Sequence, residues 1–292
     1  IGYTESENFG KVIVSTSVDG RLVKVYNANN PEFIFELRNI EQFQVYDRVL
    51  QKNISYDFAE FMNLSRAGEE ILLRGNMGWQ TIGPGEQTKL TYSFLSQAPA
   101  TGGEGGSGFT AFTAAQQQTV RDLFYVLQNQ TGLAFAEVPG DAGQIRLGVN
   151  QQANTRGYSF IPDEFKADAR AGDVWIDQET AAVMKPGQEG YYVLLHEIAH
   201  ALGLQHPLTE TDTSGATVLL NSLSSMTNTV MLNLTAADSG GSWPTWFGSF
   251  DLQALRHLYG NRAYASGNDT YVVKDATSSM TIVDDGGMDT LD

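Results

Sequence analysis

Short alternating runs of apolar and polar residues dominate the first part of the chain. In KVIVSTSVDGRLVKVY, two Val-rich runs flank Asp19 and Gly20, and an Asp-Gly pair between such runs predicts a β-hairpin. Phe33, Phe35 and Leu37 alternate in the next run, as side chains on one face of a strand do. The pattern therefore predicts a β-rich N-terminal region.

Three later segments have helical periodicity. The first begins at Thr113, where Gln116 completes a capping box, and ends near Gly132. The second contains the window LLHEIAHALGLQHP (194–207) and ends at Gly203, and the third is FDLQALRHLYG (250–260). Strand patterns separate the first two helices, in LAFAEV, QIRLGV, RGYSFI and GDVWID. Strands that precede and separate helices predict a mixed α+β layer arrangement.

Two breaks rich in Gly and Pro compete as domain boundaries. They are TIGPGEQ (81–87) and QAPATGGEGGSG (97–108). Composition alone favours the second break as the linker.

Composition narrows the class of partner. The 292 residues carry a net charge of −16, which argues against nucleic acid or an anionic membrane as a partner. There is no cysteine, so disulfides, thiolate zinc sites and cysteine nucleophiles are excluded. No apolar run approaches the ~20 residues of a membrane span. The surplus carboxylates suit either solubility or a hard cation such as calcium.

Three of the four histidines lie in the 194–207 window. Positions i and i+4 share one helix face, so His196 and His200 project side by side. Gly203 allows a sharp turn, after which His206 returns as a third ligand. Three imidazoles suit one zinc ion with an open fourth position, and Glu197 lies beside the first ligand.

The length of this motif makes a chance match improbable. An isolated histidine on an apolar helix face is usually a core residue, and the short H-E-x-x-H pattern occurs in unrelated proteins. The full H-E-x-x-H-x-x-G-x-x-H pattern is far more specific. His257 lacks metal-ligand spacing, and we expect it to be structural.

HEIAHALGLQHP resembles the signature of the metzincin zinc endopeptidases, and the adjoining Pro207 resembles the serralysin family of secreted bacterial proteases. The similarity extends over residues 87–292, through KLTYSFLSQAP, AGDVWID and LQALRHLYG. It implies an α+β catalytic domain: a twisted, mainly parallel five-stranded sheet with an antiparallel edge strand, an active-site helix and a C-terminal helix. It also places TGGEGGSG (101–108) in a loop inside that domain. We therefore expect three parts: a β-rich module or pro-segment (1–85), the catalytic domain (86–262) and the start of a calcium-binding β-roll (263–292).

The resemblance also implies roles for a zinc ion, for Glu197 and for the edge strand. Zinc would activate water and polarise the scissile carbonyl, and Glu197 would act as general base. Protein or peptide substrates would lie extended along the edge strand formed by Gly157, Tyr158, Ser159 and Phe160. Plain core packing is an equal alternative for Tyr158 and Phe160.

The resemblance is incomplete at the methionine turn that metzincins place beneath the zinc. We favour Met231 for this turn, with Met226 as the alternative. Serralysins carry a tyrosine two residues later, whereas this chain has Asn233, or Asn228 under the other alignment.

The C-terminal part resembles the entry to a calcium-binding β-roll. By position, Asp284, Gly286 and Asp289 would form one half of a calcium site, and Gly267 and Asp269 the other. An ordinary solvated acidic turn is the alternative. The chain begins at Ile1, so we expect a mature form or part of a longer parent protein.

Two classes of function follow. The first is a secreted, extracellular bacterial zinc endopeptidase that takes calcium as a structural ion. The second is a non-proteolytic or self-processing module of a large calcium-dependent adhesin, with zinc as a structural staple. The intact Glu197 favours the enzyme, and the missing tyrosine weakly favours the module.

Overall fold

The computed structural model describes the strands between residues 12 and 57 and most of the chain from residue 87 onward. The described residues are 12–16, 22–27, 30–38, 42–47, 52–57, 72–73, 78–79, 87–99, 106–162, 169–208, 226, 228–233, 243–260, 262, 264–271 and 288–291. The chain divides into two compact units, which are described separately. The smaller unit comprises residues 1–65, 264–274 and 283–292, and the larger comprises 66–263 and 275–282. The boundaries expected from sequence remain predictions.

The smaller unit contains short β-sheets. Its strands are β1 (Val12–Thr16), β2 (Leu22–Asn27), β3 (Asn30–Arg38), β4 (Gln42–Asp47), β5 (Lys52–Asp57), β12 (Thr270–Tyr271) and β13 (Thr290–Leu291). The predicted hairpin around Asp19 and Gly20 is confirmed, because β1 and β2 pair antiparallel. β3 continues that sheet, β4 pairs with β5, and β12 pairs in parallel with β13.

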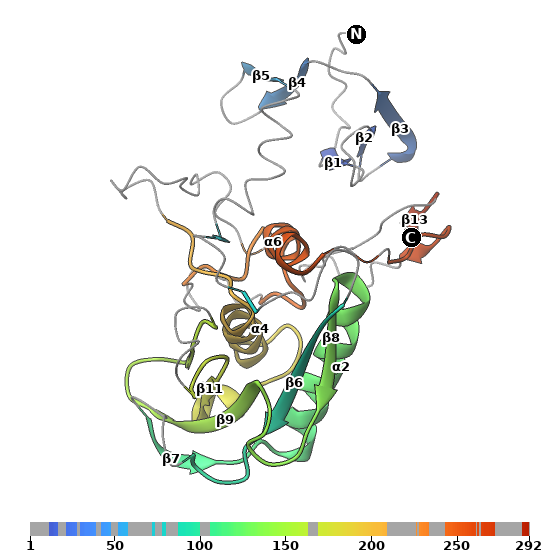
Figure 1. The fold of residues 1–292 in the computed structure, drawn as a ribbon. Helices are drawn as coiled ribbons and strands as arrows, with labels where there is room; N and C mark the ends of the chain where they lie inside the picture. The colour runs from blue at the N-terminus through green and yellow to red at the C-terminus, as the bar shows by residue number, and fades with distance from the viewer. Residues whose placement is uncertain are drawn as a thin grey trace. The chain divides into compact units, whose positions relative to one another are not determined.

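A six-stranded mixed sheet organises the larger unit (Figure 1). Its strands are β6 (Thr88–Phe94), β7 (Gly106–Thr110), β8 (Leu133–Glu137), β9 (Ile145–Gln152), β10 (Gly157–Ser159) and β11 (Val174–Asp177). The order is β10-β11-β9-β6-β8, and β7 pairs with β9. The pairs among β6, β8, β9 and β11 are parallel, whereas β10 lies antiparallel at the edge. The predicted mainly parallel sheet with an antiparallel edge strand is confirmed, but the predicted number of five strands is wrong, because β7 pairs with β9 as a sixth strand.

The sheet corrects one expectation. Residues 106–108 were predicted to lie in a loop, but they form part of β7, which pairs antiparallel with β9. The register shifts between Ser107 and Thr110, and Gly108 within that interval has a φ of +64°. Glycine adopts this conformation without steric cost, so a glycine-rich stretch that reads as a linker can follow a strand edge through an irregularity.

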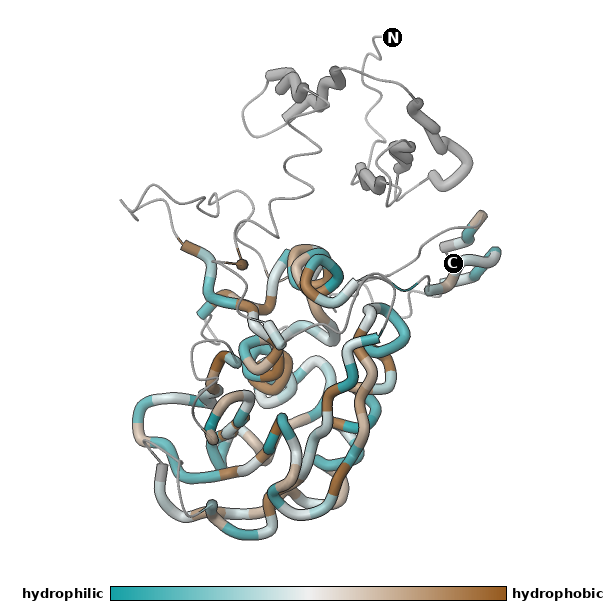
Figure 2. The backbone as a smooth tube through the Cα atoms, in the orientation of Figure 1, coloured by the Kyte–Doolittle hydropathy of each residue, from teal (hydrophilic) through white to brown (hydrophobic). Residues whose placement is uncertain are grey.

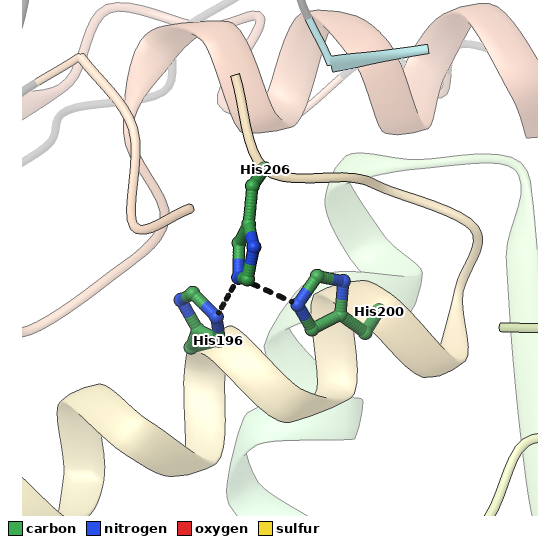
Figure 3. Close-up of side chains that lie close together, drawn as sticks. All are labelled: His196, His200 and His206. Carbon is green, nitrogen blue, oxygen red and sulfur yellow. Dashed lines mark hydrogen bonds between the residues drawn. The ribbon is translucent and has the colours of Figure 1, made fainter. Parts of the chain in front are cut away.

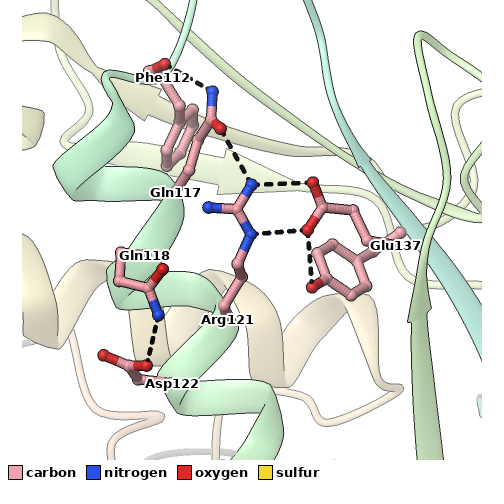
Figure 4. A network of polar contacts seen from close by, with 7 residues as sticks. Phe112, Gln117, Gln118, Arg121, Asp122 and Glu137 are labelled. Atoms are coloured by element: carbon pink, nitrogen blue, oxygen red, sulfur yellow. Dashed lines mark hydrogen bonds and ion pairs between the residues drawn. The ribbon is translucent and has the colours of Figure 1, made fainter.

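Helix α2 (Ala114–Gln130) begins as predicted, with the reciprocal capping box of Thr113 and Gln116. Its buried stripe packs against β6 and β8, and Phe124 stacks on Phe135. Outside the core, Arg121 makes a bidentate ion pair with Glu137, which also accepts a hydrogen bond from Tyr92 (Figure 4). The bond from Arg121 lowers the pKa of Glu137.

Helix α4 (Glu189–Ala201) is buried along almost its entire length, and Figure 2 shows its apolar colouring. It contacts β10 and β11 on the sheet. A helix that is apolar on most faces is typical of a protein interior. The imidazoles of the 194–207 window are therefore carried by a rigid element.

Helix α6 (Ser249–Tyr259) ends at Gly260, as predicted, with a φ of +87°. Gly132, expected only as a helix stop, has a second role: a Cβ there would lie 1.9 Å from the Tyr259 carbonyl oxygen. The Gly132 N–H donates to the Gly260 carbonyl at 2.8 Å. This close approach joins the end of α2 to the end of α6. None of the helices in the described residues is long and apolar enough to cross a membrane.

Candidate metal centre and active site

Three imidazoles converge at one point of the larger unit (Figure 3). The Nε2 atom of His206 lies 2.9 Å from that of His196 and 3.0 Å from that of His200. His196 and His200 come from successive turns of α4, and His206 comes from the segment that follows the helix. Among the described residues, this is the one histidine or carboxylate cluster with metal-ligand geometry.

The turn predicted at Gly203 is present. Gly203 has a φ of +100°, a backbone conformation that residues with a Cβ rarely adopt. Its N–H donates to the His200 carbonyl at 2.8 Å, and the Leu204 N–H donates to the Ala199 carbonyl at 3.0 Å. These bonds reverse the chain and bring His206 back to the helix face.

Backbone carbonyls fix the orientation of two of the rings. Nδ1 of His196 lies 2.7 Å from the Val230 carbonyl oxygen, and Nδ1 of His200 lies 2.7 Å from that of Leu204. A carbonyl only accepts, so each Nδ1 carries the proton and each Nε2 presents a lone pair. A carbonyl bonded to the other ring nitrogen is the usual support of a metal-ligating histidine.

The donor set fits zinc. Two nitrogens that share a tetrahedral zinc at ~2.0–2.1 Å lie about 3.3 Å apart, close to the spacings seen here. Burial, and secondarily the charge of His200, hold the pKa of His196 well below its ordinary value. The ring is therefore neutral, which is the form that binds a metal.

Glu197 lies next to the first histidine and is only 6% exposed. Burial raises the pKa of this carboxyl to about 8, while the Ser159 hydroxyl and the Arg156 charge oppose the shift. Its Oε2 atom is buried without a hydrogen-bond partner in the described part of the chain. A buried carboxyl with an unused oxygen is a costly feature for folding and a suitable proton acceptor for chemistry.

Gly157 of β10 makes room for that carboxylate. A Cβ at Gly157 would lie 2.7 Å from Cγ1 of Val193 and 2.9 Å from Cγ of Glu197. The edge strand therefore approaches α4 more closely than any residue with a side chain would permit. Sequence reasoning named Gly157 for its place in the strand and missed this packing requirement.

A pocket of about 210 Å³ opens beside Glu197. Its walls come from the start of β10, from α4 and from the segment after Met231. The lining residues are Asn154, Thr155, Arg156, Gly157, Tyr192, Val193, His196, Glu197 and Asn233.

Comparison with known proteins agrees with this geometry. The family model Matrixin (Peptidase_M10) matches residues 86–241, which is more than half of the chain. The chain belongs to the matrixin family. It is 28% identical to Serralysin G of Dickeya chrysanthemi over 261 residues, which cover 78% of this chain and 54% of that protein. It is 26% identical to Metalloprotease AprA of Pseudomonas entomophila (strain L48) over 254 residues, which cover 76% of this chain and 52% of that protein. The chain thus spans about half the length of the curated relatives that it matches, and it is a serralysin-like metzincin.

In this matrixin chain, the predicted substrate strand divides into two parts. Gly157, Tyr158 and Ser159 form β10, which pairs with β11 and ends the strand order of the described sheet. Phe160 lies beyond the strand and is buried with Leu95 and Trp175. Tyr158 packs against that cluster, and its hydroxyl accepts a hydrogen bond from Asn150 at 2.9 Å. These two aromatic side chains therefore have packing roles, whatever the backbone of β10 binds.

The segment 229–231 lies directly behind the first histidine. Met231 is fully buried, and the preceding Val230 carbonyl is the partner of His196. Asn233 lines the pocket, whereas the Asn228 carbonyl accepts the N–H of Phe250 at the start of α6. Met226 is partly exposed. This placement favours the alignment that assigns the turn to Met231.

Asp251 was missed by sequence reasoning. It is fully buried in the first turn of α6 and accepts hydrogen bonds from the Thr229 hydroxyl (2.6 Å) and from the N–H groups of Val230 and Gly248 (2.8 Å each). It therefore ties the turn behind His196 to α6. The available signal was an acidic residue three positions after Gly248.

The remaining predicted residues lie elsewhere. His257 is exposed on α6 and is not part of the histidine cluster. The Asp269 N–H donates to the Asp289 carboxylate at 2.9 Å, and the Thr290 N–H donates to the Asp269 carbonyl at 2.8 Å. Gly267 precedes this β12–β13 pair, while Asp284 and Gly286 lie outside the described residues. Calcium binding here remains a prediction.

Proposed function

We propose that the chain is a zinc-dependent endopeptidase that hydrolyses protein or peptide substrates. The observation that carries the proposal is the convergence of three imidazoles beside the buried carboxyl of Glu197, below the edge strand β10. His196, His200 and His206 would hold the zinc ion. When bound, zinc would supply a Lewis acid that polarises the scissile carbonyl and lowers the pKa of water.

Glu197 is proposed as the general base. Its carboxyl is next to the ligand set, and its Oε2 atom is free to accept a proton. A base with a pKa near neutrality can take a proton from water and return it to the leaving amine. Gly157 supports this role by leaving space for the side chain.

The substrate is proposed to pair with the backbone of β10. An extended peptide can add to the edge of a sheet through main-chain hydrogen bonds, with pockets for alternate side chains. The pocket beside Glu197 lies where one such side chain would enter, between Tyr192 and Asn233. Arg156 and Asn233 would give this pocket polar walls.

A zinc-stapled, non-proteolytic module is the alternative, and a protease that cuts its own parent chain is a third reading. Structural zinc sites are normally closed by four protein ligands. Within the residues that the structure describes, three histidines converge and no fourth histidine or carboxylate joins them. A zinc site closed by four protein ligands also gains nothing from a neighbouring buried carboxyl whose Oε2 atom has no partner among the described residues. Both observations support the endopeptidase.

The test uses denatured protein substrates with and without a zinc chelator. Glu197→Gln should abolish cleavage and leave zinc bound, because the carboxyl is not among the converging ligand atoms. Glu179→Gln is the matched control, since Glu179 is exposed in the short helix α3 (Gln178–Ala181). A wild-type chain that binds zinc and cleaves nothing would contradict the proposal, and cleavage confined to the chain itself would favour self-processing.

We also propose that the chain acts outside the cell and binds calcium through the β12–β13 region. The carboxylates of Asp269 and Asp289 supply suitable oxygen ligands. Calcium should raise the thermal midpoint of the wild-type chain and have no effect on the Asp269→Ala variant. An equal calcium response in both chains would remove this part of the proposal.

A further inference from the structure

The turn between His200 and His206 receives hydrogen bonds from residues far away in sequence. A helix leaves its last four carbonyls without intrahelical partners. At the end of α4, the carbonyls of Ile198, Ala199 and His200 accept N–H groups of the turn itself. The Ala201 carbonyl instead accepts the indole N–H of Trp79 at 2.9 Å.

A second contact lies immediately beyond the glycine. The Gln205 N–H, directly before the third histidine, donates to the Leu72 carbonyl at 2.9 Å. Leu72 is fully buried and Gln205 is 6% exposed, so water has little access to compete for this bond. Leu72 and Trp79 thus hold the two ends of the turn from Ala201 to Gln205.

Tyr259 of α6 links these contacts. Its hydroxyl donates to the Leu202 carbonyl at 2.7 Å and accepts the Trp79 backbone N–H at 3.0 Å. The neighbouring Gly78 approaches so closely that a Cβ there would lie 2.8 Å from the Tyr259 hydroxyl oxygen. The Trp79 ring also fills the space beside Gly172, where a Cβ would lie 2.6 Å from the indole.

We propose that Leu72, Trp79 and Tyr259 form a clamp that positions the third zinc ligand. Leu72 and Trp79 precede the matrixin match, which begins at residue 86, so the proposed metal centre depends on residues that this match does not include. The clamp touches neither metal nor substrate: it acts by fixing the backbone between His200 and His206. This inference rests on the proposed zinc centre.

The test compares zinc affinity in the full chain, measured by competition with a chromophoric chelator. Trp79→Phe keeps an aromatic ring and removes the N–H that reaches Ala201. Tyr259→Phe removes the hydroxyl that reaches Leu202. Outer-shell partners typically contribute ~10–100-fold in metal affinity, so for residues one step further out we expect zinc binding to weaken about fivefold in each variant.

Trp246→Phe is the matched control. The indole N–H of Trp246 donates to the buried Gln130 side chain at 2.8 Å, so the control loses an equivalent bond away from the metal ligands. We expect its zinc affinity to equal that of the wild type, although its apo-protein stability falls like that of Trp79→Phe. All affinities are measured well below the unfolding midpoints, so that global stability does not contribute.

The possible results distinguish failure of the proposed clamp from failure of the proposed metal centre. Unchanged zinc affinity in both Trp79→Phe and Tyr259→Phe, with a wild-type chain that binds zinc, overturns the clamp alone. Equal weakening in Trp246→Phe also overturns it, because the effect would then be general. A wild-type chain that binds no zinc overturns the proposed metal centre and the clamp together.

Discussion

Two substitutions of Asp251, which holds the turn behind His196, should distinguish the stability contributed by its hydrogen bonds from the stability contributed by its charge. Asp251→Ala removes the acceptor of three buried donors: the Thr229 hydroxyl and the N–H groups of Val230 and Gly248. Each buried donor left without a partner costs ~1–3 kcal/mol, and entering water recovers part of that loss. We therefore expect the free energy of unfolding to fall by about 3–6 kcal/mol.

Asp251→Asn should cost less. The amide oxygen can accept both N–H groups that now reach Oδ2, while the amide nitrogen faces the Thr229 hydroxyl oxygen. That oxygen accepts the Met231 N–H at 2.9 Å and can also accept the amide N–H, but the Thr229 hydroxyl hydrogen then loses its acceptor. The two remaining bonds to the amide oxygen are no longer charge-assisted. Neutral hydrogen bonds are roughly half as strong as charge-assisted ones, so above about pH 7, where Asp251 is ionised, we expect a loss of about 1–2 kcal/mol.

Urea unfolding of the chain in a zinc chelator measures both losses, provided that the m-value is unchanged. Burial raises the pKa of Asp251 from 3.8 to about 7, against the opposing hydrogen bonds from Thr229, Val230 and Gly248. A raised carboxyl pKa gives stability that is present below the unfolded pKa and lost as pH rises through the folded one. The deficit of the Asn variant should therefore shrink between about pH 4 and pH 7. Equal losses in the Ala and Asn variants, or an Ala loss below about 1 kcal/mol, would refute the reasoning.

Three further predictions concern the site and its supports. Gly157→Ala should lower peptidase activity at least about tenfold with zinc affinity unchanged, because its Cβ would displace Val193 and Glu197; full activity would contradict the packing argument. Burial raises the pKa of Glu197 to about 8, so the stability of the metal-free chain should fall as pH rises from about 4.5 to 8. Glu197→Gln should flatten that slope, and an unchanged slope would exclude Glu197 as its source. Arg146→Ala should destabilise the chain by about 3–5 kcal/mol in urea unfolding, because it removes the bidentate partner of the fully buried Asp173 carboxylate; a loss below about 1 kcal/mol would contradict this reasoning.

Local spacing accounts for the parts of the fold and site that the sequence predicted well. The capping box of Thr113, the i and i+4 histidines and the positive φ of Gly203 each depend on a few neighbouring residues. Periodicity also located the strands β8 to β11, because alternating or continuous apolar runs reflect burial on one or both faces. β7 was missed because Gly, Ser and Gly in its first half have the composition of a linker.

Positions that depend on packing were harder to interpret. Gly132 and Gly157 read as a helix stop and a strand residue, yet each is required because another element occupies the space of a Cβ. Nothing local distinguishes such a glycine from one that only ends a helix. The distinction needs the partner, which is the Tyr259 carbonyl in one case and Glu197 in the other.

The contacts that orient the three histidines show most clearly that local sequence does not reveal packing partners. The ligands lie within eleven consecutive positions, from His196 to His206, so a motif can name them. Their orientation comes from the Val230 carbonyl, 34 residues from His196, and from the Trp79 indole, 122 residues from Ala201. Neither acceptor has a residue-type signature, because each bond ends on a backbone carbonyl and a backbone carbonyl is present at every position. A short motif can therefore identify a metal centre correctly and still leave unspecified the contacts that hold its ligands in place, and variants at Trp79 should affect metal binding although no motif includes that residue.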